Sequence, residues 1–161
     1  MSYYTYYNSP VGRLLMECDD IALTGLWIEN QKYYAVGADK NMAIYDNHPI
    51  FIEASKWLDA YFNSKTTMGC DLPLRPRGTD FQQRVWSALC TIPYGKTRTY
   101  GDIANQLNAH PRAVGGAVGR NPILIIIPCH RVLGTGGTMT GYAAGTDIKQ
   151  TLLKLEKSPL A

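Results

Sequence analysis

The chain has 161 residues, of which 45% are hydrophobic and 18% are charged, and its formal net charge is +3 at pH 7. A chain of this length can bury one core or two small ones, and this composition is typical of a globular protein and excludes a disordered one. No stretch approaches the roughly 18 consecutive apolar residues of a membrane span, and the N-terminus lacks the pattern of a secretory signal. We therefore expect a cytoplasmic protein that does not enter membranes.

The cysteines are scattered along the chain as Cys18, Cys70, Cys90 and Cys129, and they form no Cys-x-x-Cys pair. Such spacing favours reduced thiols over a disulfide framework, and it offers no ligand set for a structural zinc ion. We therefore expect free thiols and no metal site.

Charge divides the chain into two parts. Residues 1–75 hold six Lys and Arg against nine Asp and Glu, a net charge of −3, whereas residues 76–161 hold ten against four, a net charge of +6. A basic C-terminal part favours a polyanionic partner such as DNA or RNA. A solvated basic face without a partner has the same composition, so charge alone leaves both interpretations open.

The N-terminal part has the pattern of a small sheet followed by a helix. Tyr3–Tyr7 and Arg13–Cys18 flank the turn-forming residues Ser9–Gly12, and Ile21–Ile28 is a third strand-like run. Pro49 suits the first position of a helix. The apolar positions expected in that helix are Ile50, Ile52, Trp57, Leu58, Tyr61 and Phe62.

The boundary between two domains is expected in the segment 63–80, which carries Pro73 and Pro76. Proline interrupts both helices and strands, so this segment is typical of a connection. The prediction is an α/β domain of residues 1–75 followed by a mainly helical domain of residues 76–161.

The C-terminal part is expected to hold several short helices. Thr79 can cap the first, and the spacing Thr99-x-x-Asp102 is that of a capping box for the second. Pro111 suits the start of a third helix, Arg112–Arg120, whose interior consists of Gly, Ala and Val. Two short helices around a tight turn in a basic domain indicate a helix-turn-helix, although small residues also serve plain helix packing.

The most informative stretch surrounds Cys129. The apolar run Ile123–Ile127 is typical of a buried strand, and Pro128 would end it, so that Cys129 and His130 emerge together at a strand end. A thiol beside an imidazole can be activated as a nucleophile. The glycine-rich loop Leu133–Gly141 follows, as the lid or wall of a pocket would. The pattern therefore indicates a catalytic site, although most lone cysteines are buried hydrophobic residues.

The last predicted helix supplies a carboxylate. Thr146 can cap this helix, and Lys149 and Glu156 lie with leucines on one stripe of it. A half-buried Glu156 needs a partner, and His130 is suitable because a carboxylate fixes the tautomer of an imidazole and raises its basicity. The alternative is a surface Glu156 that pairs with Lys149 or Lys157.

Together these residues resemble the O6-alkylguanine-DNA alkyltransferases, also called methylated-DNA–protein-cysteine methyltransferases. The segments that carry the resemblance are Phe81–Trp86, Arg112–Ala117, Asn121–Pro122, Pro128–Val132, Gly141–Ala143 and Leu152–Glu156. They cover about half of the chain, and their spacing across the cysteine is specific. The resemblance implies a ribonuclease-H-like α/β N-terminal domain and a mainly helical C-terminal domain with a DNA-binding helix-turn-helix.

The resemblance also implies a reaction and its residues. The catalytic positions would be Cys129, His130, Glu156, Asn121, Tyr100 and Lys149. The thiolate of Cys129 would take the alkyl group from guanine O6, His130 would accept the thiol proton through a water, and Glu156 would orient His130. Tyr100, with Lys149 nearby, would assist the departing guanine through a hydrogen bond to a ring nitrogen. Asn121 would brace the active-site turn. Each molecule would act once, because a thioether does not leave readily.

Double-stranded DNA that contains O6-alkylguanine is the implied partner, with O4-alkylthymine left open as a second substrate. The small-residue helix would enter the minor groove and flip out the damaged nucleotide. Its DNA-contacting residues would be Arg112, Ala113, Gly115 and Gly116, with Arg112 filling the place of the flipped base. The substrate pocket would be formed by Pro128, Val132, Tyr142, Ala143 and Ala144. We expect a monomer without cofactor or metal ion.

Three other functions remain open from the sequence. A lesion-binding protein without transferase activity would resemble the same family, but such proteins replace the cysteine that is present here as Cys129. A Cys-His-Glu hydrolase would need an oxyanion hole and would have no use for a small-residue helix. A plain nucleic-acid-binding module would carry the cysteine incidentally.

Overall fold

The computed structural model describes residues 1–65, 71–139 and 141–156. Two compact units, here called the N-terminal and the C-terminal unit, comprise Met1–Arg77 with Pro122–Ile126 and Gly78–Asn121 with Ile127–Ala161, respectively. No helix in the described part of the chain is long and apolar enough to cross a membrane.

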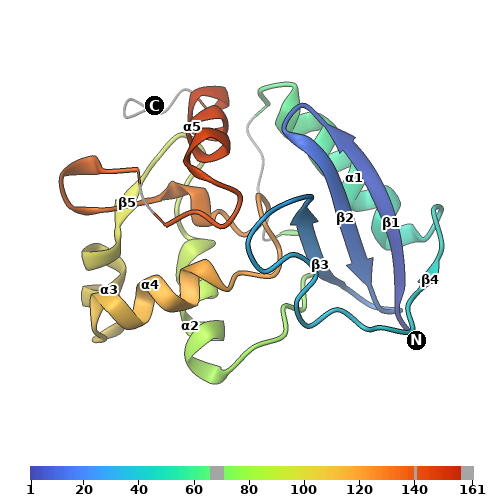
Figure 1. The fold of residues 1–161 in the computed structure, drawn as a ribbon, viewed down its shortest axis with the longest axis horizontal. Coiled ribbons are helices and arrows are strands. Elements are labelled where there is room, and N and C mark those ends of the chain that lie inside the picture. The colour runs from blue at the N-terminus through green and yellow to red at the C-terminus, as the bar shows by residue number, and fades with distance from the viewer. Residues whose placement is uncertain (66–70, 140, 157–161) are drawn as a thin grey trace. The chain divides into compact units, whose positions relative to one another are not determined.

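The N-terminal unit is a small sheet covered by one helix. Its strands are β1 (Tyr3–Ser9), β2 (Gly12–Cys18), β3 (Leu23–Ile28) and β4 (Ala43–Ile44), and the helix is α1 (Pro49–Phe62). The strand order is β3-β2-β1-β4, with antiparallel pairing from β1 to β3 and parallel pairing of β4 with β1. Figure 1 shows α1 lying along β1 and β2, and α1 contacts β1, β2 and β3. All six residues of β3 are buried, so this strand lies in the core of the unit.

The helix α1 begins as predicted and buries part of the apolar set named from the sequence. Pro49 is its first residue, and the Nδ1 atom of His48 accepts a hydrogen bond from the backbone N–H of Ile50 at 3.1 Å. Its buried residues are Phe51, Ala54, Leu58 and Tyr61, which follow a spacing of three and four. Of the apolar positions named from the sequence, Leu58 and Tyr61 are buried, whereas Ile52 is 44% exposed.

The C-terminal unit is mainly helical. Its helices are α2 (Asp80–Leu89), α3 (Tyr100–Leu107), α4 (Pro111–Gly119) and α5 (Thr146–Leu155), with 3-10 turns η2 (Cys129–Arg131) and η3 (Thr135–Gly137). The two short strands β5 (Arg98–Thr99) and β6 (Val132–Leu133) pair in parallel. Both α2 and α3 pack against α4, and these three helices lie close together in Figure 1. The pair α3 and α4, joined by a short turn, is the predicted helix-turn-helix candidate.

Local capping signals explain where these helices begin. Thr79 and Thr99 each form a capping box, with Gln82 and Asp102 as the respective partners. The prediction that Thr146 caps the last helix is wrong. The N-cap of α5 is Gly145, with φ of +100° and without a side-chain hydrogen bond. A left-handed backbone conformation favours glycine there, so the helix starts one residue before the expected position.

The predicted strand Ile123–Ile127 is absent, which corrects the sequence interpretation. The segment is buried, but only Ile123 forms a bridge, with Leu26, and Ile125 has a positive φ of +70°. Leu26 donates its N–H to Pro122 O at 2.8 Å and accepts the N–H of Leu124 at 2.9 Å, after which the chain turns. A buried turn and a buried strand share the same apolar sequence signal, so the run of isoleucines could not distinguish them.

The expectation of reduced thiols holds for only part of the described chain. Cys18 and Cys129 are free, whereas Cys90 is disulfide-bonded. Cys70 lies outside the described residues. Scattered spacing therefore did not exclude a disulfide.

Candidate active site

Cys129 is held in a short braced turn rather than at a strand end. It is the first residue of η2, and its N–H donates to Ile127 O at 2.8 Å. Asn121 Nδ2 donates to the same carbonyl oxygen at 2.8 Å, so the amide closes the loop between residues 121 and 127. Cys129 is only 3% exposed. The thiol is therefore recessed, and a reacting group has to be brought to it.

His130 and Glu156 form the predicted imidazole–carboxylate pair. His130 Nε2 and Glu156 Oε2 are 2.5 Å apart, and both side chains are fully buried. The alternative, a surface Glu156 paired with Lys149, is excluded by this burial, and Lys157 lies outside the described residues. On α5 the most buried stripe contains both Lys149 and Glu156.

Arg131 is a part of the site that the sequence analysis missed. Its Nε donates to Glu156 Oε1 at 2.8 Å, and one of its terminal nitrogens donates to Ile92 O at 2.8 Å. The backbone N–H of Gly95 adds a third donor to Glu156, at 3.1 Å from Oε1. The only available signal was the position of Arg131 beside the thiol and the imidazole, because a charged residue in an apolar stretch needs a buried partner.

Lys149 lies completely inside the C-terminal unit. Its Nζ donates to Val132 O at 2.5 Å, and the residue is 0% exposed. Burial lowers the pKa of Lys149 to about 8, although a thiolate at Cys129 acts in the opposite direction. A cation at this position favours the ionised form of the nearby thiol.

Burial sets the resting protonation of the reactive pair. It raises the pKa of the Cys129 thiol to about 11, against the hydrogen bond from Asn121 and the charge of Lys149. Burial also lowers the pKa of His130, although the hydrogen bond with Glu156 opposes that change. At neutral pH the site therefore holds a thiol beside a neutral imidazole. Such a pair needs a proton transfer before the sulfur can attack.

Glu156 stays ionised despite its burial. Desolvation alone would raise its pKa, but the hydrogen bonds and charges of His130 and Arg131 hold the pKa well below its usual range. A buried carboxylate that accepts three hydrogen bonds is stable as an anion. Glu156 can therefore fix the orientation of His130.

A cavity of about 560 Å³ opens beside the small-residue helix α4. The described residues that line it are Tyr100, Gly101, Pro111, Arg112, Gly115, Gly134, Thr135 and Gly141. It thus brings Tyr100, Arg112 and Gly115 together, as the predicted assignments require. A Cβ atom at Gly141 would lie 2.7 Å from the Tyr100 hydroxyl oxygen, and φ at Gly141 is +75°, so glycine is required there.

None of the predicted pocket residues is among the described residues that line this cavity. Pro128 and Val132 are buried, Tyr142 is 8% exposed, and Ala143 and Ala144 are half-buried. Thr135 and Gly101 line the opening instead, and no sequence pattern singled them out. The sequence offered little to mark these two residues as part of a pocket, because glycine and threonine are common in any loop.

The outer face of α4 offers small residues and one arginine. Arg112, Ala113 and Gly116 are exposed, and Gly115 is half-buried beside the ring of Tyr100. His110 Nδ1 accepts the N–H of Arg112 at 3.1 Å and so caps the first turn of the helix.

The inner face of α4 is fixed to α2. Trp86 Nε1 donates to Ala117 O at 2.9 Å, and both residues are buried. The exposed face of α4 is therefore held on a rigid support, as a binding surface requires.

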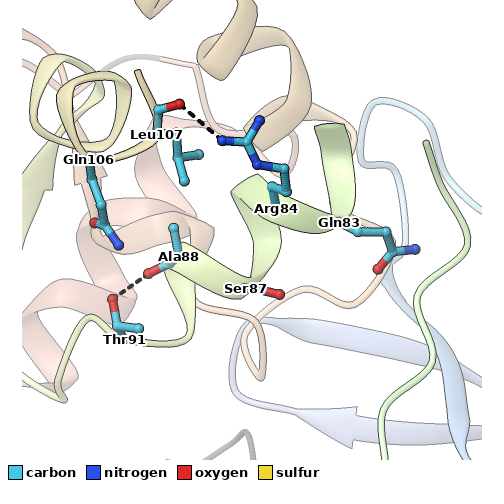
Figure 2. A pocket seen from close by; sticks show the side chains of 7 residues that line it. All are labelled: Gln83, Arg84, Ser87, Ala88, Thr91, Gln106 and Leu107. Atoms are coloured by element: carbon cyan, nitrogen blue, oxygen red, sulfur yellow. Dashed lines mark hydrogen bonds between the residues drawn. The ribbon is translucent and has the colours of Figure 1, made fainter. Parts of the chain in front are cut away.

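A second cavity, of about 420 Å³, lies between α2 and α3 and contains none of the predicted site residues (Figure 2). The side chains that line it are those of Gln83, Arg84, Ser87, Ala88, Thr91, Gln106 and Leu107. Arg84 donates to Leu107 O at 3.0 Å and Thr91 Oγ1 donates to Ala88 O at 2.6 Å, so two of its polar groups bond within its own wall. We assign the site to the first cavity, because its lining includes Tyr100, Arg112 and Gly115, which are predicted site residues. Among the described residues no group of three or more His, Cys, Asp or Glu is placed to hold a metal ion.

Comparison with known proteins matches both halves of the chain to one family. Residues 2–76 match the family described as "6-O-methylguanine DNA methyltransferase, ribonuclease-like domain", and residues 80–158 match its "DNA binding domain". Methylated-DNA–protein-cysteine methyltransferases of Methanosarcina barkeri and Haemophilus influenzae are 48% and 45% identical to this chain. Each alignment covers 98% of this chain, with 99% of the first relative and 87% of the second.

Solved structures agree with these sequence matches. The O6-methylguanine methyltransferase of Mycobacterium tuberculosis is 46% identical, with a TM-score of 0.86 over 98% of this chain and 93% of that chain. A crystal structure of Mycobacterium tuberculosis OGT in complex with DNA is 45% identical, with a TM-score of 0.87 over 96% of this chain and 92% of that chain.

Proposed function

The chain belongs to the 6-O-methylguanine DNA methyltransferase family and repairs DNA by direct alkyl transfer, and we propose that Cys129 is the residue that accepts the alkyl group. The hydrogen bond between His130 and Glu156, buried directly beside this thiol, is the observation that carries the proposal. In this arrangement His130 is the base, Glu156 orients it, and Cys129 is the nucleophile.

The reaction is a displacement at carbon. The sulfur of Cys129 forms a bond to the alkyl carbon, the bond from that carbon to guanine O6 breaks, and the electron pair stays on the guanine. Tyr100 is half-buried in the cavity wall, and its hydroxyl supplies a hydrogen bond to a ring nitrogen of the departing base. The products are unmodified guanine and an S-alkylcysteine. Because the cysteine thiolate is a poor leaving group from the thioether that forms, each molecule acts once.

The thiol proton leaves before or during the attack. A thiol whose pKa lies near 11 is protonated at neutral pH, so a base has to take its proton. Neutral His130 accepts it through a water, and Glu156 stabilises the imidazolium that forms. The charge of Lys149 then favours the thiolate during the attack.

The recessed thiol requires the damaged nucleotide to leave the duplex. Cys129 is 3% exposed, and a base stacked in DNA cannot approach it that closely. The exposed Gly/Ala face of α4 enters the minor groove, and Arg112 occupies the gap left in the stack. The related Mycobacterium tuberculosis structure in complex with DNA supports DNA as the partner.

The remaining assignments follow from the same resemblance. Pro128, Val132, Tyr142, Ala143 and Ala144 surround the flipped base, and Asn121 braces the turn that presents the thiol. O4-alkylthymine is a second candidate substrate. The protein acts as a monomer in the cytoplasm and needs no cofactor.

A stoichiometric titration tests the proposal. Increasing amounts of a duplex with one O6-methylguanine are incubated to completion with a fixed amount of protein, and repaired guanine is counted after digestion of the DNA. The expected plateau is one repaired guanine per protein molecule. Repair that continues beyond one equivalent would contradict a single-turnover protein, and binding without repair would place the chain among lesion binders.

A further inference from the structure

We propose that Arg131 is a positioning residue for alkyl transfer, which holds Glu156 as an anion and thereby keeps His130 neutral with Nδ1 as its proton-accepting atom. The inference rests on the proposed function of Cys129 and adds a residue whose role in the reaction the sequence did not indicate.

The two oxygens of Glu156 have different partners. Oε2 faces His130 Nε2 at 2.5 Å, and Oε1 accepts from Arg131 Nε at 2.8 Å and from the N–H of Gly95 at 3.1 Å. The carboxylate is therefore fixed by donors on both sides and cannot rotate without losing at least one of them. An ionised carboxylate in this position accepts a hydrogen bond from the N–H of Nε2. The lone pair of the neutral imidazole is then on Nδ1.

Arg131 is itself fixed by the turn after α2. Its second hydrogen bond goes to Ile92 O at 2.8 Å, and its guanidinium carbon lies 5.7 Å from the centre of the Tyr94 ring. Gly95 in the same turn has φ of +78°, and a Cβ atom there would lie 3.1 Å from Glu156 O. The turn thus approaches the end of α5 closely and holds the arginine and the carboxylate together.

The charges around His130 come from three directions. Glu156 and Lys149 face it from α5, Arg131 and Cys129 lie beside it in η2, and the Tyr142 ring stands edge-on at 6.4 Å between centroids. A lone carboxylate at 2.5 Å would favour a protonated imidazole. Burial of the imidazole is the main effect that opposes protonation, and the positive charges of Arg131 and Lys149 act in the same direction, so the imidazole stays neutral and can act as a base.

Loss of Arg131 therefore has a defined consequence. Without the guanidinium, the negative charge of Glu156 is balanced by one more proton on the His130–Glu156 pair at neutral pH. A protonated pair cannot take the proton of the thiol. The transfer rate falls at neutral pH and recovers as the pH is raised, whereas purely structural damage lowers the rate at every pH.

The test compares Arg131→Gln and Arg131→Lys with the unaltered chain. Arg13→Gln is the matched control, because Arg13 donates to Glu29 at the same 2.8 Å but both of these side chains are exposed. The protonation and tautomer of each imidazole are followed by NMR of the ring nitrogens between pH 5 and 9. The rate of methyl transfer from an O6-methylguanine duplex is measured over the same range in single-turnover experiments.

We expect a neutral His130 protonated at Nε2 in the unaltered chain at pH 7. In Arg131→Gln we expect the midpoint of the rate profile to move upward by about one pH unit, so that the rate falls by at most about threefold at pH 7 and by about tenfold well below the midpoint of the unaltered chain. Arg131→Lys should keep the profile of the unaltered chain, because its charge is retained, and so should Arg13→Gln.

Three outcomes would overturn the inference. These are a protonated His130 or the Nδ1–H tautomer in the unaltered chain, an unshifted profile in a folded Arg131→Gln variant, and an equal loss in both Arg131 variants at every pH. The first outcome needs no variant, so the inference remains testable even if Arg131→Gln does not fold. If the unaltered chain transfers no methyl group at all, the proposed function fails, and the NMR titration still decides the role of Arg131.

Discussion

Each of the two units buries one glutamate and pairs it with an arginine, but the two glutamates have different neighbours. In the N-terminal unit, Glu17 accepts from the Thr24 hydroxyl at 2.8 Å, from the N–H of Asp39 at 2.7 Å and from Arg77. In the C-terminal unit, Glu156 accepts from Arg131 and also faces the imidazole of His130. Both carboxylates are 0% exposed at the side chain.

The difference shows that a buried ion pair does not by itself indicate a catalytic site. A hydroxyl and a backbone N–H do not take up protons near neutral pH, so the Glu17 cluster can only hold its surroundings together. The Glu156 cluster contains His130, which can change its charge, and it lies next to a thiol. The neighbour of the carboxylate, rather than the carboxylate itself, separates structural from catalytic use.

Neutralising each glutamate in turn tests whether Glu156 has a catalytic role that Glu17 lacks. Glu156→Gln should slow methyl transfer about 100-fold, because His130 loses the group that orients it and stabilises its charged form. Glu17→Gln should leave the rate within about threefold. Single-turnover rates on an O6-methylguanine duplex measure both effects.

Stability provides the control for that experiment. Glu156→Gln leaves the buried Arg131 without its carboxylate and should lower the free energy of unfolding by about 3 kcal/mol in urea titrations. Glu17→Gln should lower it less, because the side chain of Arg77 is 43% exposed. Equal losses of rate in the two variants would show that Glu156 acts only through the stability of the fold.

The next largest effect is expected at the exposed arginine of α4. Arg112→Ala should slow repair of duplex DNA about tenfold, since the residue no longer offsets the cost of unstacking the damaged nucleotide. The reaction with free O6-methylguanine base should be nearly unchanged. Arg13→Ala, in the N-terminal unit, is the control, and equal losses on duplex and free base would count against an inserted arginine.

A smaller effect is expected for the hydroxyl of Tyr100. Tyr100→Phe keeps the ring beside Gly115 but removes one hydrogen bond to the departing base, which should slow transfer about fivefold without changing DNA affinity. Tyr7→Phe removes a hydroxyl that donates to Asp59 in the N-terminal unit, and it should leave the rate unchanged. An unaltered rate in Tyr100→Phe would remove Tyr100 from the reaction.

Acid pH should lower the free energy of unfolding, because His130 and Glu156 in the C-terminal unit become protonated more readily in the unfolded chain. The folded-state pKa of both His130 and Glu156 is lowered, so the unfolded chain binds more protons than the folded chain below their unfolded values. Stability should therefore fall as the pH drops below about 6.5 for His130, and fall further below about 4.5 for Glu156. Urea titrations at pH 7.5, 5.5 and 4 measure this, and a stability that rises on acidification would contradict the assigned protonation.

The features that the sequence predicted are those with local signals. The helix cap at Thr79, the capping box at Thr99 and the prolines that begin α1 and α4 depend on residues within one turn, so their patterns were sufficient. The buried turn before Cys129 was mistaken for a strand, because apolar sequence reports burial without reporting backbone conformation.

The site was predictable in part for the same reason. His130 and Glu156 could be paired because the stripe of α5 and the family resemblance both pointed to them. The role of Arg131 could not be predicted, since one of its two acceptors is the backbone carbonyl oxygen of Ile92, 39 residues away. No side chain marks such an acceptor in the sequence. Gly95 likewise matters through its backbone N–H.

The central claim is that the sulfur of Cys129 receives the alkyl group. Intact-mass spectrometry after incubation with a duplex that carries one O6-methylguanine tests it directly, with Cys129→Ser and Cys18→Ser as the two matched variants. The account predicts a gain of one methyl group, mapped to Cys129, in the unaltered chain and in Cys18→Ser but not in Cys129→Ser. An unchanged mass in the unaltered chain, or a methyl group mapped to another residue, would contradict it.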